Sequence, residues 1–260
     1  MAFATLKYEL TDGIAVVTIN RPEKNSAISM EMRADFRALA DELYANEAVR
    51  VVVFTGTGKT FCVGADVSTF ETDWNTPVFR ANTRLLTSFF NDLEALEKPL
   101  IAAINGTCVG GGLELALACD LRIAARSARF GLPEIGLGLL PLMVSAPIYR
   151  ALGSRKALLD LVLTGRQIDA AEAKQLGLVS RVVEASELDA EIARLTATLL
   201  AFSPSALRLG KEAVYTLCEM EYLTSMRYLR EMIVLTSRTE DAQEGIRAFF
   251  EKRKPVWTGR

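Results

Sequence analysis

Two glutamates each stand alone in a long uncharged stretch of the sequence. Glu114 is the only charged residue in positions 101–119, and Glu134 is the only one in positions 130–148. An ionised carboxylate that is buried without a partner is costly, so it is usually paired, neutralised or used in chemistry. Two carboxylates that line one pocket have pKa values pushed apart, which gives one acid and one base. The pattern therefore suggests an acid–base pair.

Each glutamate also has a purely structural interpretation. Glu114 would lie in the first turn of a helix, where an acid complements the helix dipole, and the local pattern alone favours this interpretation. Glu134 would be a loop carboxylate that binds a nearby arginine, such as Arg122 or Arg129. Glycosidases also use paired carboxylates, but the sequence lacks the run of exposed aromatic residues expected of a sugar cleft.

The sequence contains no histidine. This excludes Ser-His-Asp and Cys-His catalysis, histidine-ligated metals and a histidine general base. The four cysteines show no CxxC spacing, and we expect reduced thiols with neither a disulfide framework nor a zinc site. Acid–base chemistry must therefore come from carboxylates, lysine, tyrosine or cysteine.

Three consecutive glycines, Gly110 to Gly112, directly precede an apolar helical segment. Glycine lets the backbone approach a ligand, and the free N–H groups of a first helical turn favour negative charge. A second glycine-rich segment, residues 56–70, passes through Ala65 and Asp66. Either Asp66 caps a helix there, or this backbone supplies a second donor to the same place as the triplet. The spacing matches neither a phosphate loop nor a dinucleotide-binding motif.

The elements that would position these residues alternate between strand and helix. Residues 13–20, 49–58 and 99–107 are typical of strands, and residues 121–134 are typical of a strand and loop. Amphipathic helices are predicted over 29–46, opened by Ser29, and over 76–97. From about Ser154 onward the pattern predicts mainly helices, with a long run to Lys252. The alternation indicates an α/β architecture.

Length and charge limit the class of protein. The 260 residues suit one large domain, or one domain with a smaller appendage, and the net charge of −2 provides no basic field for nucleic acid. The first ten residues lack the features of a signal peptide, and both uncharged stretches contain a glutamate, glycines and prolines. We expect a cytoplasmic protein, cytosolic or matrix-type, with no membrane partner.

Several motifs in a fixed order resemble the crotonase superfamily, which has the enoyl-CoA hydratase/isomerase fold. They cover nearly the whole chain and read RPEKNSAIS, GTGKTFCVGADV, KPLIAAINGTCVGGGLELALACDLRIAARSARFGLPEIGLGLLP, LTGRQIDAAEAKQLGLVSRVV and AFFEKRKPVW. The resemblance implies an α/β, ClpP-like spiral of ββα turns over residues 1–200. It also implies a helical region over residues 201–260 for oligomerisation and CoA contacts, in a homotrimer or a hexamer formed by two trimers.

The resemblance also implies an activity. Members bind acyl-CoA thioesters and stabilise an enolate in an oxyanion hole, whose donors here would be the N–H groups of Ala65 and Gly111. Glu114 and Glu134 match the two carboxylates of the family's hydratases, which add water to a trans-2-enoyl-CoA to give a 3-hydroxyacyl-CoA. Glu134 would donate the proton and Glu114 would orient the water. The alternatives are a Δ3,Δ2-enoyl-CoA isomerase that uses mainly Glu134, and a catalytically silent acyl-CoA-binding scaffold.

The CoA part of the substrate is expected to bind backbone around Lys24 to Ala27 and along Cys62 to Ala65. Phe249 and Lys252 match positions that reach the CoA of a neighbouring subunit, although the charged run 251–254 is equally typical of a solvated helix end. The substrate- and CoA-binding positions implied in this way are Lys24, Asn25, Ala27, Cys62, Ala65, Asp66, Val67, Gly110, Leu142, Phe249 and Lys252. CoA belongs to the substrate, so neither a cofactor nor a metal is expected.

One segment departs from the family pattern. Hydratases typically follow the second glutamate with a PGAGGTQRL-like run, whereas this chain has PLMVSAPIYRAL. Leu142 stands in place of a glycine whose backbone helps to hold the catalytic water. An N–H group survives this replacement, but the bulk of Leu142 and Met143 is expected to reshape the acyl pocket. Pocket depth is also expected to depend on the stretch from Trp74 to Phe79.

Overall fold

The computed structural model describes residues 3–70 and 76–260, and its larger sheet has six strands in the order β1-β2-β3-β5-β7-β10. Only β1 and β2 pair in antiparallel fashion, and every other neighbouring pair in this sheet is parallel. The strands are β1 (Leu6–Thr11), β2 (Ile14–Ile19), β3 (Val51–Gly56), β5 (Leu100–Ile104), β7 (Leu121–Ala125) and β10 (Arg181–Val183).

A smaller sheet of four strands lies beside the larger one and has the order β4-β6-β8-β9. The pairs β4·β6 and β6·β8 are parallel, and β8·β9 is antiparallel. The strands are β4 (Thr60–Cys62), β6 (Thr107–Val109), β8 (Arg129–Gly131) and β9 (Gln167–Asp169).

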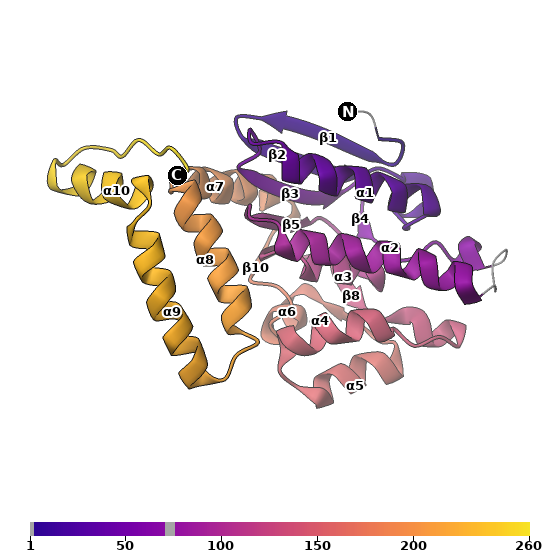
Figure 1. Ribbon diagram of the computed structural model, residues 1–260. Coiled ribbons are helices and arrows are strands. Elements are labelled where there is room, and N and C mark those ends of the chain that lie inside the picture. Colours follow the sequence, from indigo (N-terminus) through magenta and orange to yellow (C-terminus); the bar gives the residue numbers. More distant parts are fainter. Residues whose placement is uncertain (1–2, 71–75) are drawn as a thin grey trace.

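The chain enters the two sheets in a repeating order. A strand joins the large sheet, the next joins the small sheet, and a helix follows, as in β3-β4-α2, β5-β6-α3 and β7-β8-α4. The predicted spiral of ββα turns is therefore confirmed (Figure 1). The helices are α1 (Met30–Ala45), α2 (Thr76–Ala95), α3 (Gly111–Leu117), α4 (Leu142–Leu152), α5 (Arg155–Thr164), α6 (Ala170–Gln175), α7 (Leu188–Leu200), α8 (Pro204–Leu217), α9 (Tyr222–Ser237) and α10 (Glu240–Phe250).

Strands buried on both faces account for the uncharged runs of the sequence. Every residue of β5 is buried, as are the first four residues of β3, because helices cover the parallel sheet. The largest core side chains include Phe36, Phe54, Phe61 and Phe130, all fully buried. Cys62, Cys108 and Cys119 are buried, as expected of small core residues, whereas Cys218 is exposed and is not part of the core.

The local signals for the helices were mostly correct. Ser29 caps α1 by accepting a hydrogen bond from the Met32 N–H at 3.2 Å, as predicted. The long C-terminal run is divided into α9 and α10, because the Thr239 side chain accepts from the Ala242 N–H and starts a new helix. Strand β1 was not predicted, and it joins the sheet through the Asp12-Gly13 turn, where both residues have positive φ.

Helices α8, α9 and α10 extend away from the two sheets on one side of the molecule (Figure 1). A half-buried cluster attaches α8 to the core, since Asp120 accepts from Lys211 Nζ at 3.0 Å, from the Tyr215 hydroxyl at 2.9 Å and from the Leu100 N–H at 2.7 Å. The division into residues 1–200 and 201–260 stays a prediction. Among the described residues, no helix combines the length and apolar character that a membrane crossing requires.

Candidate active site

Two backbone loops leave the small sheet side by side. They follow β4 and β6, which are adjacent parallel strands with Cys62 opposite Cys108. Their approach is so close that a Cβ on Gly64 would lie 2.8 Å from the Gly111 nitrogen, and Gly64 also has φ of +85°. A Cβ on Gly112 would lie 2.1 Å from the Cys62 carbonyl oxygen. Glycine is therefore required at both positions for the loops to meet.

Each loop carries a backbone N–H group for which no acceptor is found in the described part of the chain. Ile28 forms a parallel bridge that uses the Gly64 carbonyl at 2.8 Å and the Asp66 N–H at 3.0 Å, which leaves the N–H of Ala65 unused. Gly111 is the first residue of α3, so its N–H has no partner within the helix. A Cβ built on Gly111 would lie 3.9 Å from the Ala65 nitrogen, so the two donors lie close together.

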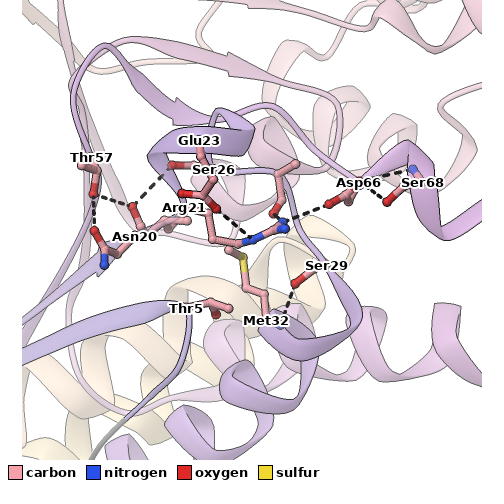
Figure 2. Close-up of polar contacts among 12 residues, drawn as sticks. Thr5, Asn20, Arg21, Glu23, Ser26, Ser29, Met32, Thr57, Asp66 and Ser68 are labelled. Atoms are coloured by element: carbon pink, nitrogen blue, oxygen red, sulfur yellow. Dashed lines mark hydrogen bonds and ion pairs between the residues drawn. The ribbon is translucent and has the colours of Figure 1, made fainter.

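An arginine holds the first of these loops against the segment that precedes α1 (Figure 2). Arg21 donates to the Ala27 carbonyl at 2.6 Å and to the Asp66 carboxylate at 3.1 Å. The other Asp66 oxygen accepts from the Ser68 N–H at 3.2 Å and from its hydroxyl at 2.7 Å, and these bonds hold the Asp66 pKa below its usual range. Asp66 thus caps the short 3₁₀ helix Val67–Phe70, which confirms that interpretation.

Replacing Arg21 with methionine is expected to lower the free energy of unfolding by about 1–3 kcal/mol, because Asp66 and the Ala27 carbonyl lose a charged donor. The side chain of Arg21 is only 16% exposed and that of Asp66 only 10%, so water is a poor replacement for the lost donor. Denaturant unfolding measures the change. The matched control is Arg126→Met, which breaks an exposed pair with Glu184 and should cost less than about 0.5 kcal/mol. Equal losses in the two variants would contradict this account.

The two glutamates meet at the N-terminus of α3. Glu114 lies in the first turn of that helix and is only 9% exposed. Glu134 lies in the 3₁₀ helix Pro133–Leu137, and its Oε1 would be 2.5 Å from a Cβ on Gly110, the residue that precedes α3. Its Oε2 is buried without a hydrogen-bond partner among the described residues. The structure therefore brings the predicted pair together.

The structural interpretation of Glu134 as an arginine partner was wrong. The Arg122 guanidinium donates to the Leu178 carbonyl at 2.7 Å and to the Cys119 carbonyl at 3.0 Å. Arg129 donates to backbone carbonyls of the adjacent turn. Both arginines donate to backbone groups instead, and Glu134 has no ion-pair partner among residues 3–70 and 76–260.

Burial raises the pKa of both carboxyl groups. Desolvation, and then the nearby charge of Glu134, raise the pKa of Glu114 from 4.5 to about 7. Desolvation also raises the pKa of Glu134, although its own backbone N–H opposes the change. A carboxyl that holds its proton near neutral pH can donate and accept protons.

The raised pKa predicts how stability depends on pH. A carboxyl that binds its proton more tightly in the folded protein favours folding at low pH, and that contribution is lost as the pH rises from 4.5 to about 7. Glu114→Gln cannot titrate, so its free energy of unfolding should fall less than that of the wild type across this window. Urea unfolding at a series of pH values measures the difference. The exposed control Glu212→Gln should follow the wild type, and a Glu114→Gln curve parallel to the wild type would contradict the prediction.

A cavity of about 240 Å³ opens in front of Glu114. It lies between α2 and α4, with Glu114 and Ala118 on the α3 side. Its other lining residues are Thr87, Phe90, Asn91, Glu94, Met143, Ala146, Pro147 and Arg150. Glu114 and Met143 could be identified from the sequence, but the polar residues of α2 and Arg150 could not. The available signal was the repeated i, i+3, i+4, i+7 spacing on both helices.

The remaining predicted positions are distributed over several segments. Lys24 and Asn25 are exposed, Ala27 is buried beneath them, and Val67 is exposed. Asn25 and Ser26 have φ of 50° and 56°, so the chain turns sharply there. Part of the stretch from Trp74 to Phe79 lies outside the described residues.

Of the predicted site residues, Glu114 lines the cavity, whereas Leu142, Phe249 and Lys252 lie apart from both the cavity and the N-terminus of α3. The Leu142 side chain is 71% exposed, and its N–H already donates to the Leu140 carbonyl at 2.8 Å. The surviving N–H expected at this position is therefore engaged. Phe249, at 78% exposure, and Lys252 lie on and just after α10, which is far from α3 (Figure 1).

Comparison with known proteins places this geometry in a family. The family model described as Enoyl-CoA hydratase/isomerase matches residues 9–260. The chain is 41% identical to a probable enoyl-CoA hydratase of Mycobacterium leprae, over 98% of this chain and 100% of that protein. It is 37% identical to a short-chain-enoyl-CoA hydratase of Clostridium acetobutylicum, over 93% and 92% of the two chains.

A crystal structure of an enoyl-CoA hydratase from Bacillus anthracis has a TM-score of 0.92 to this chain, with 32% identity over 98% of this chain and 100% of that one. The fold is thus that of the crotonase superfamily, with a helical C-terminal region, as the sequence indicated. The chain belongs to the enoyl-CoA hydratase/isomerase family, and it is an enzyme of that family.

Proposed function

We propose that the protein hydrates trans-2-enoyl-CoA thioesters to 3-hydroxyacyl-CoA. The observation that carries the proposal is the meeting of two free N–H groups and two buried carboxyl groups at the N-terminus of α3. The thioester oxygen accepts hydrogen bonds from Ala65 and Gly111, which form the oxyanion hole and stabilise the enolate. The hydratase names of the relatives from Mycobacterium leprae and Clostridium acetobutylicum support the same reaction.

The two glutamates have different roles in the addition of water: Glu114 activates the water molecule and Glu134 supplies a proton to C2. The ionised carboxylate of Glu114 orients and deprotonates water, whose hydroxide forms a bond with C3 of the enoyl group. The electrons of the double bond move toward the thioester oxygen, and the enolate collapses as protonated Glu134 delivers a proton to C2. The titrations of Glu114 and Glu134 are coupled, because ionisation of one carboxyl group makes ionisation of the other less favourable. The pair therefore holds one proton between the two groups.

The CoA portion is proposed to bind backbone of residues 24–27 and 62–67, with Gly110 at the thioester end. Phe249 and Lys252 would contact the CoA of a neighbouring copy in a homotrimer or hexamer. The exposed apolar side chains of α9 and α10 support such an assembly, and they include Tyr222, Leu223, Ile233, Phe249 and Phe250. No metal or cofactor is proposed, because carboxyl and backbone groups supply every proton and charge contact in the reaction.

A second candidate, the Δ3,Δ2-enoyl-CoA isomerase, is favoured by one observation. The Leu142 N–H, expected to help to hold water, is already bonded to Leu140. An isomerase needs no added water, since one carboxylate moves a proton between two carbons, and Glu134 would serve. The meeting of both carboxyl groups with both donors argues against a catalytically silent scaffold.

Loss of absorbance at the enoyl-thioester band tests the proposal, with crotonyl-CoA as substrate. We expect turnover by the wild type and strong losses in both Glu114→Gln and Glu134→Gln. Turnover of a 3-enoyl-CoA that survives Glu114→Gln but not Glu134→Gln would identify the isomerase instead. Binding of acyl-CoA without turnover of either substrate would identify the scaffold.

A further inference from the structure

The cavity in front of Glu114 is a groove between two matched helical stripes. From α2 come Thr87, Phe90, Asn91 and Glu94, and from α4 come Met143, Ala146, Pro147 and Arg150. Both sets have the spacing i, i+3, i+4, i+7, which places each set on one face of its helix. The two faces therefore form the walls of the groove, with α3 between them (Figure 1).

Both ends of the groove are bridged by side chains. At one end the Thr87 hydroxyl lies 3.9 Å from the Met143 sulfur, and at the other Glu94 Oε2 lies 3.3 Å from Arg150 Nη1. Thr87 and Met143 are the first lining residues of α2 and α4, and Glu94 and Arg150 are the last, so the two helices run in the same direction. Seven residues of helix separate the bridges, a length of about 10 Å.

The groove differs chemically between its two ends. Phe90, Ala118 and Met143 supply an apolar lining, and Phe90 is buried. The Glu94–Arg150 pair supplies charge, and Arg150 also pairs with Glu219 at 3.2 Å. Arg150 therefore already has two carboxylate partners, and the three groups together carry one net negative charge.

We propose that the Glu94–Arg150 ion pair ends the acyl pocket and restricts it to short, uncharged acyl groups. This inference rests on the proposed function, since it assumes that the acyl chain passes Glu114 into the groove. A longer chain would press methylene groups against both charges and displace their water, which is unfavourable. The chain would also forgo the gain of about fourfold in binding for each methylene buried on an apolar surface.

Charge balance also excludes acyl groups that end in a carboxylate. Such a group would meet Arg150 only by displacing Glu94 or Glu219, and otherwise it would add a third negative charge. The pair itself is weak, because Arg150 is 44% and Glu94 30% exposed. The limit on the acyl chain therefore comes from the cost of removing water from Glu94 and Arg150, and not from the strength of their ion pair. Removal of both charges should allow longer acyl chains to bind.

The test compares kcat/KM for crotonyl-CoA and trans-2-decenoyl-CoA. The wild type is expected to prefer crotonyl-CoA. Glu94→Leu combined with Arg150→Met removes both charges and should raise the decenoyl-to-crotonyl ratio at least about tenfold, as two or more additional methylenes are buried. The exposed pair variant Arg126→Met with Glu184→Gln, just after β7 and β10, is the matched control and should leave the ratio unchanged. An unchanged ratio in the Glu94/Arg150 variant would overturn the inference.

A second variant covers the possibility that the double variant does not fold. Glu94→Gln leaves Arg150 with one carboxylate partner, and it should raise the ratio of kcat/KM for glutaconyl-CoA over crotonyl-CoA at least about tenfold. An unchanged ratio here would also count against the inference.

Failure of the proposed function has a different signature. In that case the wild type turns over none of these thioesters, and calorimetric binding of butyryl-CoA and decanoyl-CoA then tests the pocket alone. The wild type should bind butyryl-CoA as tightly as decanoyl-CoA or more tightly, and the double variant should favour decanoyl-CoA. Tighter wild-type binding of decanoyl-CoA would overturn the inference about the pocket.

Discussion

Glu134→Gln is expected to lower kcat for hydration of crotonyl-CoA by about 10²–10⁴-fold, the usual contribution of a positioned general acid. Glutamine keeps the shape of the side chain, and its amide can still lie beside Gly110, but it has no proton to deliver to C2. Because Glu134 Oε2 has no partner among the described residues, its replacement breaks no hydrogen bond of the fold. We therefore expect the folded structure and KM to change much less than kcat.

The measurement is the steady-state rate at the enoyl-thioester absorbance, together with urea unfolding of the same sample. Glu212→Gln makes the same chemical change on the exposed surface of α8 and should keep the wild-type kcat. A Glu134→Gln enzyme with kcat within threefold of the wild type would remove Glu134 from the reaction.

Gly112→Ala is the second change with a large expected effect. The new methyl group would lie 2.1 Å from the Cys62 carbonyl oxygen and 2.8 Å from the Cys62 Cβ, so backbone must move. Either α3 shifts and carries Gly111, or β4 shifts and carries Ala65 toward a new position. Loss of one oxyanion donor costs about 10²–10³-fold in kcat, and overpacking costs about 1–3 kcal/mol of stability.

The control separates this steric effect from the ordinary effect of alanine. Gly210 lies within α8, and a Cβ built there meets nothing within 4 Å. Gly210→Ala should therefore stabilise the protein by about 0.5–1 kcal/mol through helix propensity, with kcat unchanged. Unfolding and kcat are measured for both variants, and a Gly112→Ala enzyme with wild-type values of both would contradict the crowding seen between α3 and β4.

The sequence predicted most of the architecture because its signals were local. Ser29 marks the start of α1, and the apolar runs of β3 and β5 mark strands buried on both faces. Strand β1 was missed because its alternating pattern, with charged Lys7 and Glu9 on one side, lies at the edge of the sheet. Its place depends on pairing with β2, which a local pattern does not reveal.

The candidate site was predictable where a residue type was unusual in its surroundings. Glu114, Glu134 and the glycine triplet all stand out in uncharged sequence, and the structure brings them together. Arg21 did not stand out, because its role depends on Asp66, 45 residues later. The Glu94–Arg150 pair, 56 residues apart, was missed for the same reason. Contacts that join distant segments have no signature in the spacing of either segment.

The pairing of β4 with β6 has a consequence for how such an enzyme can change during evolution. The loops that carry Ala65 and Gly111 follow strands held at the fixed spacing of a hydrogen-bonded ladder, about 4.8 Å. The distance between the two N–H donors is thus set by main-chain geometry, which is the same for nearly any side chain in those strands. The groove is instead lined by side chains of α2 and α4. Mutations on these helices can alter substrate preference while the donors keep their separation, so a lineage can acquire new substrates without rebuilding its catalytic centre.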